Sequence, residues 1–193
     1  GKEDEKVLTE SIEALKNESQ HMKELVEQLL FLARGDSGRN TLNKVRLDLN
    51  QMVSEVWEES QMIDEKHRYL FRGTDPAYMT GDIAMIKQSI RIFVQNAAKY
   101  SSDGADITLG VMLESGYVSY MIQDEGIGME SSDVVHIFER FYRSDEARNS
   151  ETGGSGLGLS IAKWIVDAHS GTIQVVSRPE IGTRFIVRFP MCE

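Results

Sequence analysis

The sequence has a single cysteine, no long apolar run and no excess of positive charge. Cys192 stands next to the last residue, which excludes an intrachain disulfide and a CxxC-type zinc site and gives no sign of an oxidising compartment. The most apolar stretch, residues 25–33, is much shorter than the roughly 20 residues of a membrane span and carries Glu27 and Gln28. Because the net charge is −10, the chain lacks the basic character that a nucleic-acid partner requires, and we expect no such partner.

The chain also lacks an initiator methionine and an apolar leader, since it opens GKEDE. We therefore expect no signal peptide and interpret the chain as a piece of a longer protein. Its 193 residues, 40% hydrophobic and 27% charged, suit one full globular domain with an additional element rather than a disordered segment.

A long amphipathic helix is predicted over residues 1–34. Apolar or small residues recur at alternating steps of four and three, which is a heptad seam that needs a partner helix: Leu8, Ile12, Leu15, Ser19, Met22, Val26, Leu29 and Ala33. The alternative is a helix folded back on its own domain. Gly35 is predicted to end the helix, and residues 35–40 to form a linker.

Residues 41–193 have a mixed pattern of helices and strands. Helices are predicted at 50–65, 82–100 and 157–169, and strands at 45–49, 68–72, 77–80, 106–113, 117–123, 172–176 and 183–189. In the second helix Asp82 is a candidate N-cap, and an apolar face is predicted from Ile83, Ile86, Ile90, Phe93, Val94 and Ala97. Because helices and strands are partly segregated, the pattern favours an α/β fold, a two-layer sandwich with helices on one face of a mixed sheet.

Glycine is concentrated in two short clusters at the ends of predicted elements. Residues 124–129 read DEGIGM after a strand, and residues 153–159 read GGSGLGL at the start of the last helix. Such glycines indicate backbone that passes close to another group, and a helix start favours an anion, so the pair points to a nucleotide. Two ordinary tight turns are the alternative, and neither cluster fits a P-loop or a Rossmann motif.

Two further segments carry groups suited to a nucleotide. Asn96 offers an amide oxygen for a hard cation such as Mg²⁺, and Lys99 a charge for phosphates, although a polar helix end would look the same. Residues 137–143, IFERFYR, precede a polar run at 144–152 and resemble the anchor of a lid. The alternative for this segment is a surface loop with core aromatic residues.

Together these segments resemble the ATP-binding catalytic domain of bacterial two-component sensor histidine kinases, of the GHKL superfamily. NAAKY at 96–100 is similar to the N box, DEGIG at 124–128 to the G1 box, FERFYR at 138–143 to the F box, and GGSGLGL at 153–159 to the G2 box. The closing segment GTRF at 182–185 also resembles the family. The resemblance implies a histidine kinase ATPase fold over residues 41–193, preceded at residues 1–34 by the second helix of a dimerisation and phosphotransfer hairpin.

The resemblance also implies roles for individual residues. Asp124 would bind the adenine amino group with Thr183 behind it, Asn96 would hold Mg²⁺, and Gly126 and Gly128 would let the lid move. Contacts to ribose or phosphates would come from Lys99, Tyr100 and Arg143, and from the backbone of Gly154, Gly156, Leu157 and Gly158. The implied reaction transfers the γ-phosphoryl group of ATP to a histidine by positioning and charge neutralisation, with Asn96, Lys99 and Arg143 as the catalytic residues.

The sequence departs from the family pattern in two respects. Ile92 stands one turn before Asn96, where the family usually carries a second amide or acidic metal ligand. The phosphoacceptor motif is absent, since no histidine is followed by an acidic residue: His21, His67, His136 and His169. His21 is a poor candidate acceptor. We therefore expect a chain that binds ATP but cannot phosphorylate itself without its acceptor helix.

The resemblance implies partners and a location as well. The intact protein would be a homodimer in a phosphorelay with a response regulator, and a membrane sensor whose catalytic domain lies in the cytoplasm. Two alternatives stay open. One is a degenerate nucleotide-binding regulatory module, which Ile92 favours. The other is an ATPase of the chaperone or mismatch-repair type. Such an ATPase would need a water-activating carboxylate one turn before Asn96, and positions 91–93 are not acidic.

Overall fold

The computed structural model describes residues 2–144 and 154–192. The chain divides into two compact units, residues 1–40 and 41–193. None of the helices in the described ranges is long and apolar enough to cross a membrane.

The first unit is dominated by the helix α1, Lys2–Asp36. The prediction that Gly35 ends this helix is wrong, because Gly35 is helical and the chain turns at Gly38, whose φ of +65° suits a residue without a Cβ. Arg39 N donates to Arg34 O at 2.9 Å and closes the last turn. The large apolar residues of the seam are 41–71% exposed: Leu8, Ile12, Leu15, Met22, Val26 and Leu29.

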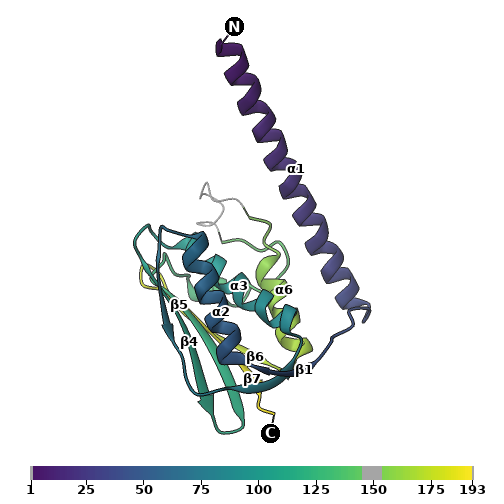
Figure 1. Cartoon of the computed structure of the whole chain (residues 1–193), viewed down its shortest axis with the longest axis vertical. Helices are drawn as coiled ribbons and strands as arrows, with labels where there is room; N and C mark the ends of the chain where they lie inside the picture. The colour runs from purple at the N-terminus through teal and green to yellow at the C-terminus, as the bar shows by residue number, and fades with distance from the viewer. Residues whose placement is uncertain (1, 145–153, 193) are drawn as a thin grey trace. The chain divides into compact units, whose positions relative to one another are not determined.

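The second unit is a two-layer α/β sandwich, which confirms the predicted fold class (Figure 1). A five-stranded sheet has the order β2-β4-β5-β7-β6, with β2 parallel to β4 and all other neighbours antiparallel. Its strands are β2 (Arg68–Arg72), β4 (Asp106–Glu114), β5 (Tyr117–Asp124), β6 (Thr172–Arg178) and β7 (Gly182–Pro190). The predicted strands at 45–49 and 77–80 form instead a separate antiparallel pair, β1 (Val45–Asp48) and β3 (Tyr78–Gly81).

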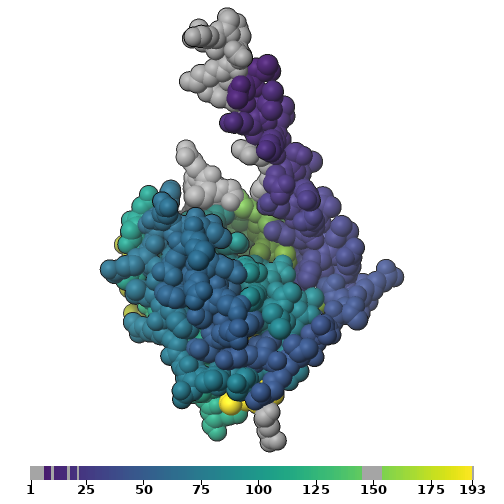
Figure 2. All heavy atoms as spheres, in the orientation of Figure 1, coloured from purple at the N-terminus to yellow at the C-terminus, as the bar shows by residue number. Residues whose placement is uncertain are grey.

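Three helices cover one face of the sheet: α2 (Leu49–Ile63), α3 (Ile83–Tyr100) and α6 (Gly158–Ala168). Figure 2 shows this face, with the atoms of α2 and α3 lying over the strands. A short helix, α4 (Ser131–Val134), follows the first glycine cluster. Helices α2 and α3 each begin at an aspartate cap, since the Asp48 side chain accepts from Asn50 N and the Asp82 side chain accepts from Met85 N.

The core lies between the three helices and the sheet. Phe93 of α3 packs on Phe185 of β7 with ring centroids 4.7 Å apart, and Tyr120 of β5 is fully buried, its hydroxyl 2.9 Å from Ser89 Oγ. The predicted inward face of α3 is confirmed at its other positions, but Ile83, the first residue of the helix, is 43% exposed.

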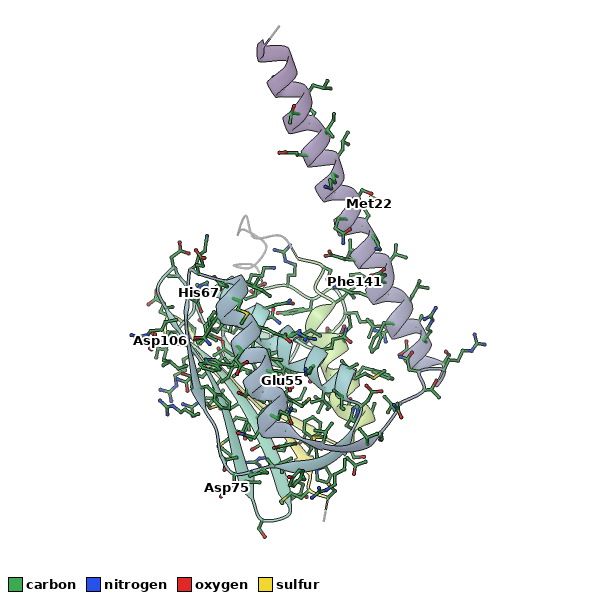
Figure 3. All side chains as sticks on the ribbon, viewed as in Figure 1. Met22, Glu55, His67, Asp75, Asp106 and Phe141 are labelled. Carbon is green, nitrogen blue, oxygen red and sulfur yellow. The ribbon has the colours of Figure 1, made fainter. Side chains whose placement is uncertain are left out.

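The ends of α3 and of strands β2, β4 and β5 meet at one end of the sheet. Arg68 and Asp106, the first residues of β2 and β4, form a bidentate ion pair, and Ile107 pairs with Asp124 at the end of β5. His67 and Asp106 are labelled at this end in Figure 3. The candidate site is built here.

Candidate nucleotide-binding site

Asp124 is a buried carboxylate at the last position of β5, with 7% of its surface exposed. Its Oδ1 atom accepts hydrogen bonds from Gly126 N at 2.9 Å and from Thr183 N at 3.0 Å. No residue in the described ranges donates to Oδ2. Burial raises the pKa of Asp124 above its ordinary value, and the two backbone hydrogen bonds oppose that rise. The result is an oriented, poorly solvated acceptor that suits a donor group of a ligand.

Three glycines around Asp124 are required by close backbone contacts. A Cβ on Gly126 would overlap the carbonyl of Tyr100, one on Gly128 that of Arg178, and one on Gly182 that of Asp124 itself. Gly128 and Gly182 also have φ of +67° and +124°. Gly182 begins β7, and the turn between β6 and β7 precedes it. These contacts show tight packing of the G1 loop against α3 and the β6–β7 turn.

Thr183 lies directly beside Asp124 and is itself buried. Its Oγ1 atom is 2.9 Å from Ser177 Oγ, and Ser177 Oγ also donates to Gly182 O at 3.1 Å. Ser177 lies in none of the sequence motifs. The signal that could have revealed it is the register of β6 and β7, which pairs Ser177 with Thr183 across the turn.

The N box occupies the last turns of α3. Lys99 Nζ lies against the α-carbon of Gly154 and 5.1 Å from the centre of the Tyr100 ring. Burial, and secondarily the charge of Arg143, lower the pKa of Lys99. Burial raises the pKa of Tyr100, which the charge of Arg143 opposes. The structure therefore brings Lys99, Tyr100, Arg143 and Gly154 together, as a site for phosphates requires.

Asn96 lies one turn before Tyr100 and is half-buried. Its carboxamide makes no hydrogen bond to any residue that the structure describes, so a hard amide oxygen is available to a ligand. Ile92, one turn earlier, packs against the first residue of α6, since a Cβ on Gly158 would lie 3.5 Å from Ile92 Cγ2. No three His, Cys, Asp or Glu side chains within 2–144 and 154–192 form a metal site, so these ranges contain no ready-made protein cage for a metal ion.

The G2 box leads into α6, although its first glycine, Gly153, lies outside the described residues. Gly156 has φ of +69° and lies against the backbone of Phe141, whose N–H donates to Gly156 O at 3.0 Å. The side chain of Leu157 is fully buried, and its N–H donates to Ser155 Oγ at 3.2 Å. The side chain of Leu157 is therefore not available for a phosphate, and its N–H would have to leave Ser155 Oγ to bind one.

The F box lies against the G2 box. Ile137 is buried and Phe138 packs against the core, which fits the predicted anchor. Phe141, labelled in Figure 3, is 58% exposed and has a left-handed backbone with φ of +65°. Tyr142 OH donates to Asp133 Oδ1 at 2.8 Å and fastens the segment to α4. The predicted lid at 144–152 lies outside the described residues except for Ser144.

The histidines have separate surroundings. His67 contacts Asp64 Oδ2 at 2.7 Å, His136 contacts Glu139 Oε1 at 2.7 Å, and His169 is buried at the end of α6. His21 lies on α1, and its side chain is outside the described part of the chain.

Comparisons with known proteins agree with this geometry. Residues 81–193 match the family described as histidine kinase-, DNA gyrase B-, and HSP90-like ATPase. The chain is 40% identical over 183 residues to the sensor histidine kinase YkoH of Bacillus subtilis (strain 168), covering 95% of this chain and 40% of that protein. It is 34% identical over 195 residues to the signal transduction histidine-protein kinase ArlS of Staphylococcus epidermidis (strain ATCC 35984), covering 99% and 42%. The chain thus spans about two fifths of the length of these relatives.

Solved structures share the fold. Full-length ShkA, crystallised in complex with AMPPNP, superposes with a TM-score of 0.79 at 24% identity, covering 92% of this chain and 37% of that one. The Acinetobacter baumannii histidine kinase AdeS gives a TM-score of 0.73 at 24% identity, covering 94% and 84%. The sequence match over more than half of the chain, the shared fold and the convergence of the four boxes lead to one conclusion. The chain belongs to the histidine kinase-, DNA gyrase B-, and HSP90-like ATPases and contains the ATP-binding catalytic domain of a histidine kinase.

Proposed function

We propose that this chain binds ATP with Mg²⁺ and transfers the γ-phosphoryl group to a histidine on a helix outside the chain. The single observation that carries the proposal is the convergence at one end of the sheet of a buried acceptor, Asp124, and a cationic group, Lys99, that lies against the G2 loop at Gly154. An oriented carboxylate suits a base, and a cation beside backbone N–H groups suits phosphates.

Asp124 would select the base. Its Oδ1 atom is held by two backbone N–H groups, so Oδ2 is left to accept from the adenine amino group. Gly126, Gly128 and Gly182 let the surrounding backbone close around this carboxylate, and Thr183 lies behind it. A guanine ring presents a carbonyl instead of this amino group, so the carboxylate would discriminate against it.

Lys99, Arg143 and the G2 loop would hold the phosphates. The two cations lie close enough for the charge of Arg143 to depress the Lys99 pKa, and an anion between them would relieve that repulsion. The first N–H groups of α6 add the favourable end of an 11-residue helix dipole. Tyr100 would contact the ribose or the phosphates from the same turn of α3.

Asn96 would hold Mg²⁺ through its amide oxygen, with the phosphates and water completing the coordination. When bound, the ion would neutralise phosphate charge and fix the geometry for phosphoryl transfer. The chain's own residues contribute position and charge, because phosphoryl transfer requires little covalent chemistry from the protein.

The acceptor and partners complete the proposal. The exposed seam of α1 suits a second helix of a dimerisation hairpin, and the acceptor histidine would lie on the other helix. We propose a homodimeric membrane sensor as the parent protein, with this domain in the cytoplasm and a response regulator as the final phosphate acceptor.

Isothermal titration with ATP, with and without Mg²⁺, tests the nucleotide site. Binding that strengthens with Mg²⁺ is expected, and no binding would overturn the proposal. The transfer step is tested by adding a separately produced helical hairpin of a longer form of this protein and following acid-labile phosphorylation of its histidine. Nucleotide binding without any transfer would overturn the kinase step alone.

A regulatory module that binds nucleotide without phosphotransfer is the second candidate. Ile92 favours it, because this side chain packs against α6 where a second metal ligand would stand. Nucleotide binding that does not respond to Mg²⁺ would support this candidate.

A further inference from the structure

His169 connects the two helices that carry the nucleotide site. It caps the C-terminal end of α6 with 4% of its surface exposed. Its Nε2 atom is 3.0 Å from the backbone nitrogen of Asp82, the N-cap of α3, and its Nδ1 atom is 2.7 Å from Ile165 O. A backbone N–H can only donate and a carbonyl can only accept. Nε2 is therefore the acceptor and Nδ1 carries the proton, so the ring is a neutral imidazole.

The two helices run in opposite directions, so this contact lies at the ends remote from the site. At His169 the end of α6 meets the beginning of α3. Further along, Gly158 at the start of α6 lies beside Ile92, and Lys99 in the last turn of α3 lies against Gly154. The 11 residues of α6 span roughly 16 Å between the two ends.

We propose that His169 is a positioning residue for nucleotide binding, which fixes α6 along α3 and so holds the G2 loop against Asn96 and Lys99. This inference rests on the proposed nucleotide site. Hydrophobic burial has no directional preference, so it does not by itself specify one position of α6 along α3. The hydrogen bond from Asp82 N to His169 Nε2 is directional and joins the two helices, and the bond from Nδ1 to Ile165 O orients the ring.

The groups around His169 support this role. Asp82 Oδ2 also accepts a hydrogen bond from Asn43 N at 2.9 Å, and Lys44 Nζ donates to Ala168 O at 2.8 Å. The ring packs edge-on to Phe189 of β7, with centroids 6.3 Å apart. The start of the domain, α3, α6 and β7 therefore converge on this side chain.

Protonation of the imidazole would break the contact, because Nε2–H would then face the N–H of Asp82. Two charged groups face the ring: Lys44 disfavours its protonated form and Asp82 favours it. Burial is the larger effect and lowers the pKa of His169 below its ordinary value. The stabilising contact is complete above the unfolded pKa of about 6.5 and is lost as pH falls through the lower folded value.

The test compares His169→Gln, His169→Phe and Ser89→Ala in the full chain. Glutamine offers a carbonyl to Asp82 and an amide to Ile165, whereas phenylalanine keeps the ring and loses both hydrogen bonds. Ser89→Ala removes a buried hydrogen bond from the middle of α3, to Tyr120, and controls for lost stability without a changed helix end. Each variant is titrated with ATP at about pH 7.5 and then at successively lower pH below about 6.5, because the folded pKa of His169 lies below its ordinary value.

We expect His169→Phe to weaken ATP binding by roughly tenfold and His169→Gln to stay within about threefold of the parent chain. Ser89→Ala should bind as the parent does. Lowering the pH should weaken ATP binding by the parent chain more than ATP binding by His169→Gln. Asp124 is present in both chains, so the difference between them reports on His169. If His169→Phe binds ATP as tightly as Ser89→Ala does, the positioning role is overturned.

Hydrogen exchange of the nucleotide-free chains separates this inference from the proposed function. We expect His169→Phe to accelerate exchange of the amides at 154–158 relative to Ser89→Ala. If the parent chain binds no ATP but His169→Phe still exchanges faster at 154–158 than Ser89→Ala, the nucleotide proposal fails and the positioning of the loop stands. Equal exchange in both variants would overturn the positioning role.

Discussion

The ammonium group of Lys99 lies against the α-carbon of Gly154, so the end of α3 meets the loop before α6 at this contact. A side chain at position 154 would displace this ammonium group. The same contact brings the N box and the G2 box, which are far apart in the sequence, side by side. In the proposed function the two boxes would bind the same phosphates.

Replacement of Lys99 by methionine should weaken ATP binding and leave adenosine binding unchanged. The loss of one charge-assisted contact to a phosphate corresponds to about 1.5–3 kcal/mol, or roughly ten- to a hundredfold in affinity. Calorimetric titration with each ligand measures the difference. Lys163→Met is the matched control, because Lys163 pairs on the exposed face of α6 with Asp167. An equal loss for adenosine would place Lys99 outside the phosphate subsite.

Asp124→Asn should change binding and stability in opposite directions. Asparagine keeps an oxygen for Gly126 N and Thr183 N but carries no charge, so ATP affinity should fall by about 1.5–3 kcal/mol. Removal of a buried charge should raise the free energy of unfolding by roughly 1 kcal/mol at neutral pH. Urea denaturation without nucleotide measures the second effect.

The stability gain of Asp124→Asn should depend on pH. The folded pKa of Asp124 is raised, so the protonated form stabilises the fold fully below the unfolded value of about 3.9 and this stabilisation is lost as pH rises through the folded pKa. The variant's advantage should therefore grow as pH rises through that range. A constant difference from acid to neutral pH would contradict the assigned burial effect.

Alanine at two glycines with similar backbone angles should have very different effects. Gly116 has φ of +81° and open space around its Cβ position, so Gly116→Ala should cost about 1 kcal/mol of stability. Gly128 has φ of +67° and its Cβ would overlap the carbonyl of Arg178, so Gly128→Ala should cost more than about 3 kcal/mol. Thermal unfolding of both variants without nucleotide tests this difference. Equal decreases in the unfolding temperature of the two variants would show that the G1 loop can move to accommodate a Cβ at position 128.

Ile92→Asn should increase the effect of Mg²⁺ on ATP binding. It adds an amide oxygen one helical turn before Asn96, where both could reach one ion. It also removes an apolar contact with Gly158, so stability should fall by about 1–3 kcal/mol. The ratio of ATP affinities with and without Mg²⁺ is the measurement, and Ile92→Val is the control. A ratio equal to that of the control would mean that position 92 does not reach the ion.

Local patterns in the sequence predicted much of this fold. Residues 68–72 form a strand as predicted, and Asp82 caps α3, because strand alternation and aspartate caps are local features. The pairing of β1 with β3 depends on contacts between segments about 30 residues apart, so periodicity did not reveal it. Gly35 was a misleading stop signal, since a glycine within a helix is only mildly unfavourable and a later glycine can turn the chain.

The parts of the candidate site that lie within contiguous sequence motifs were predictable. The resemblance to histidine kinases, which the four boxes carry, implied a common site for Lys99, Tyr100, Arg143 and the G2 loop. Ser177 and His169 were not identified, because each contacts a residue from another element, Thr183 and Asp82 respectively, and such pairing is not visible in the local sequence. The sequence around a single polar residue does not indicate which distant residue it contacts.

The parallel pairing of β2 with β4 has a consequence for how the sheet assembles. Strands β4 and β5 are joined by the two residues Ser115 and Gly116, whereas β3 and α3 lie between β2 and β4 in the chain. Closing the longer connection costs more chain entropy before its contacts form. We therefore expect the β4–β5 hairpin to form before β2 joins β4. In that order, the end of the sheet at which we propose the nucleotide site is completed late, when Arg68 meets Asp106.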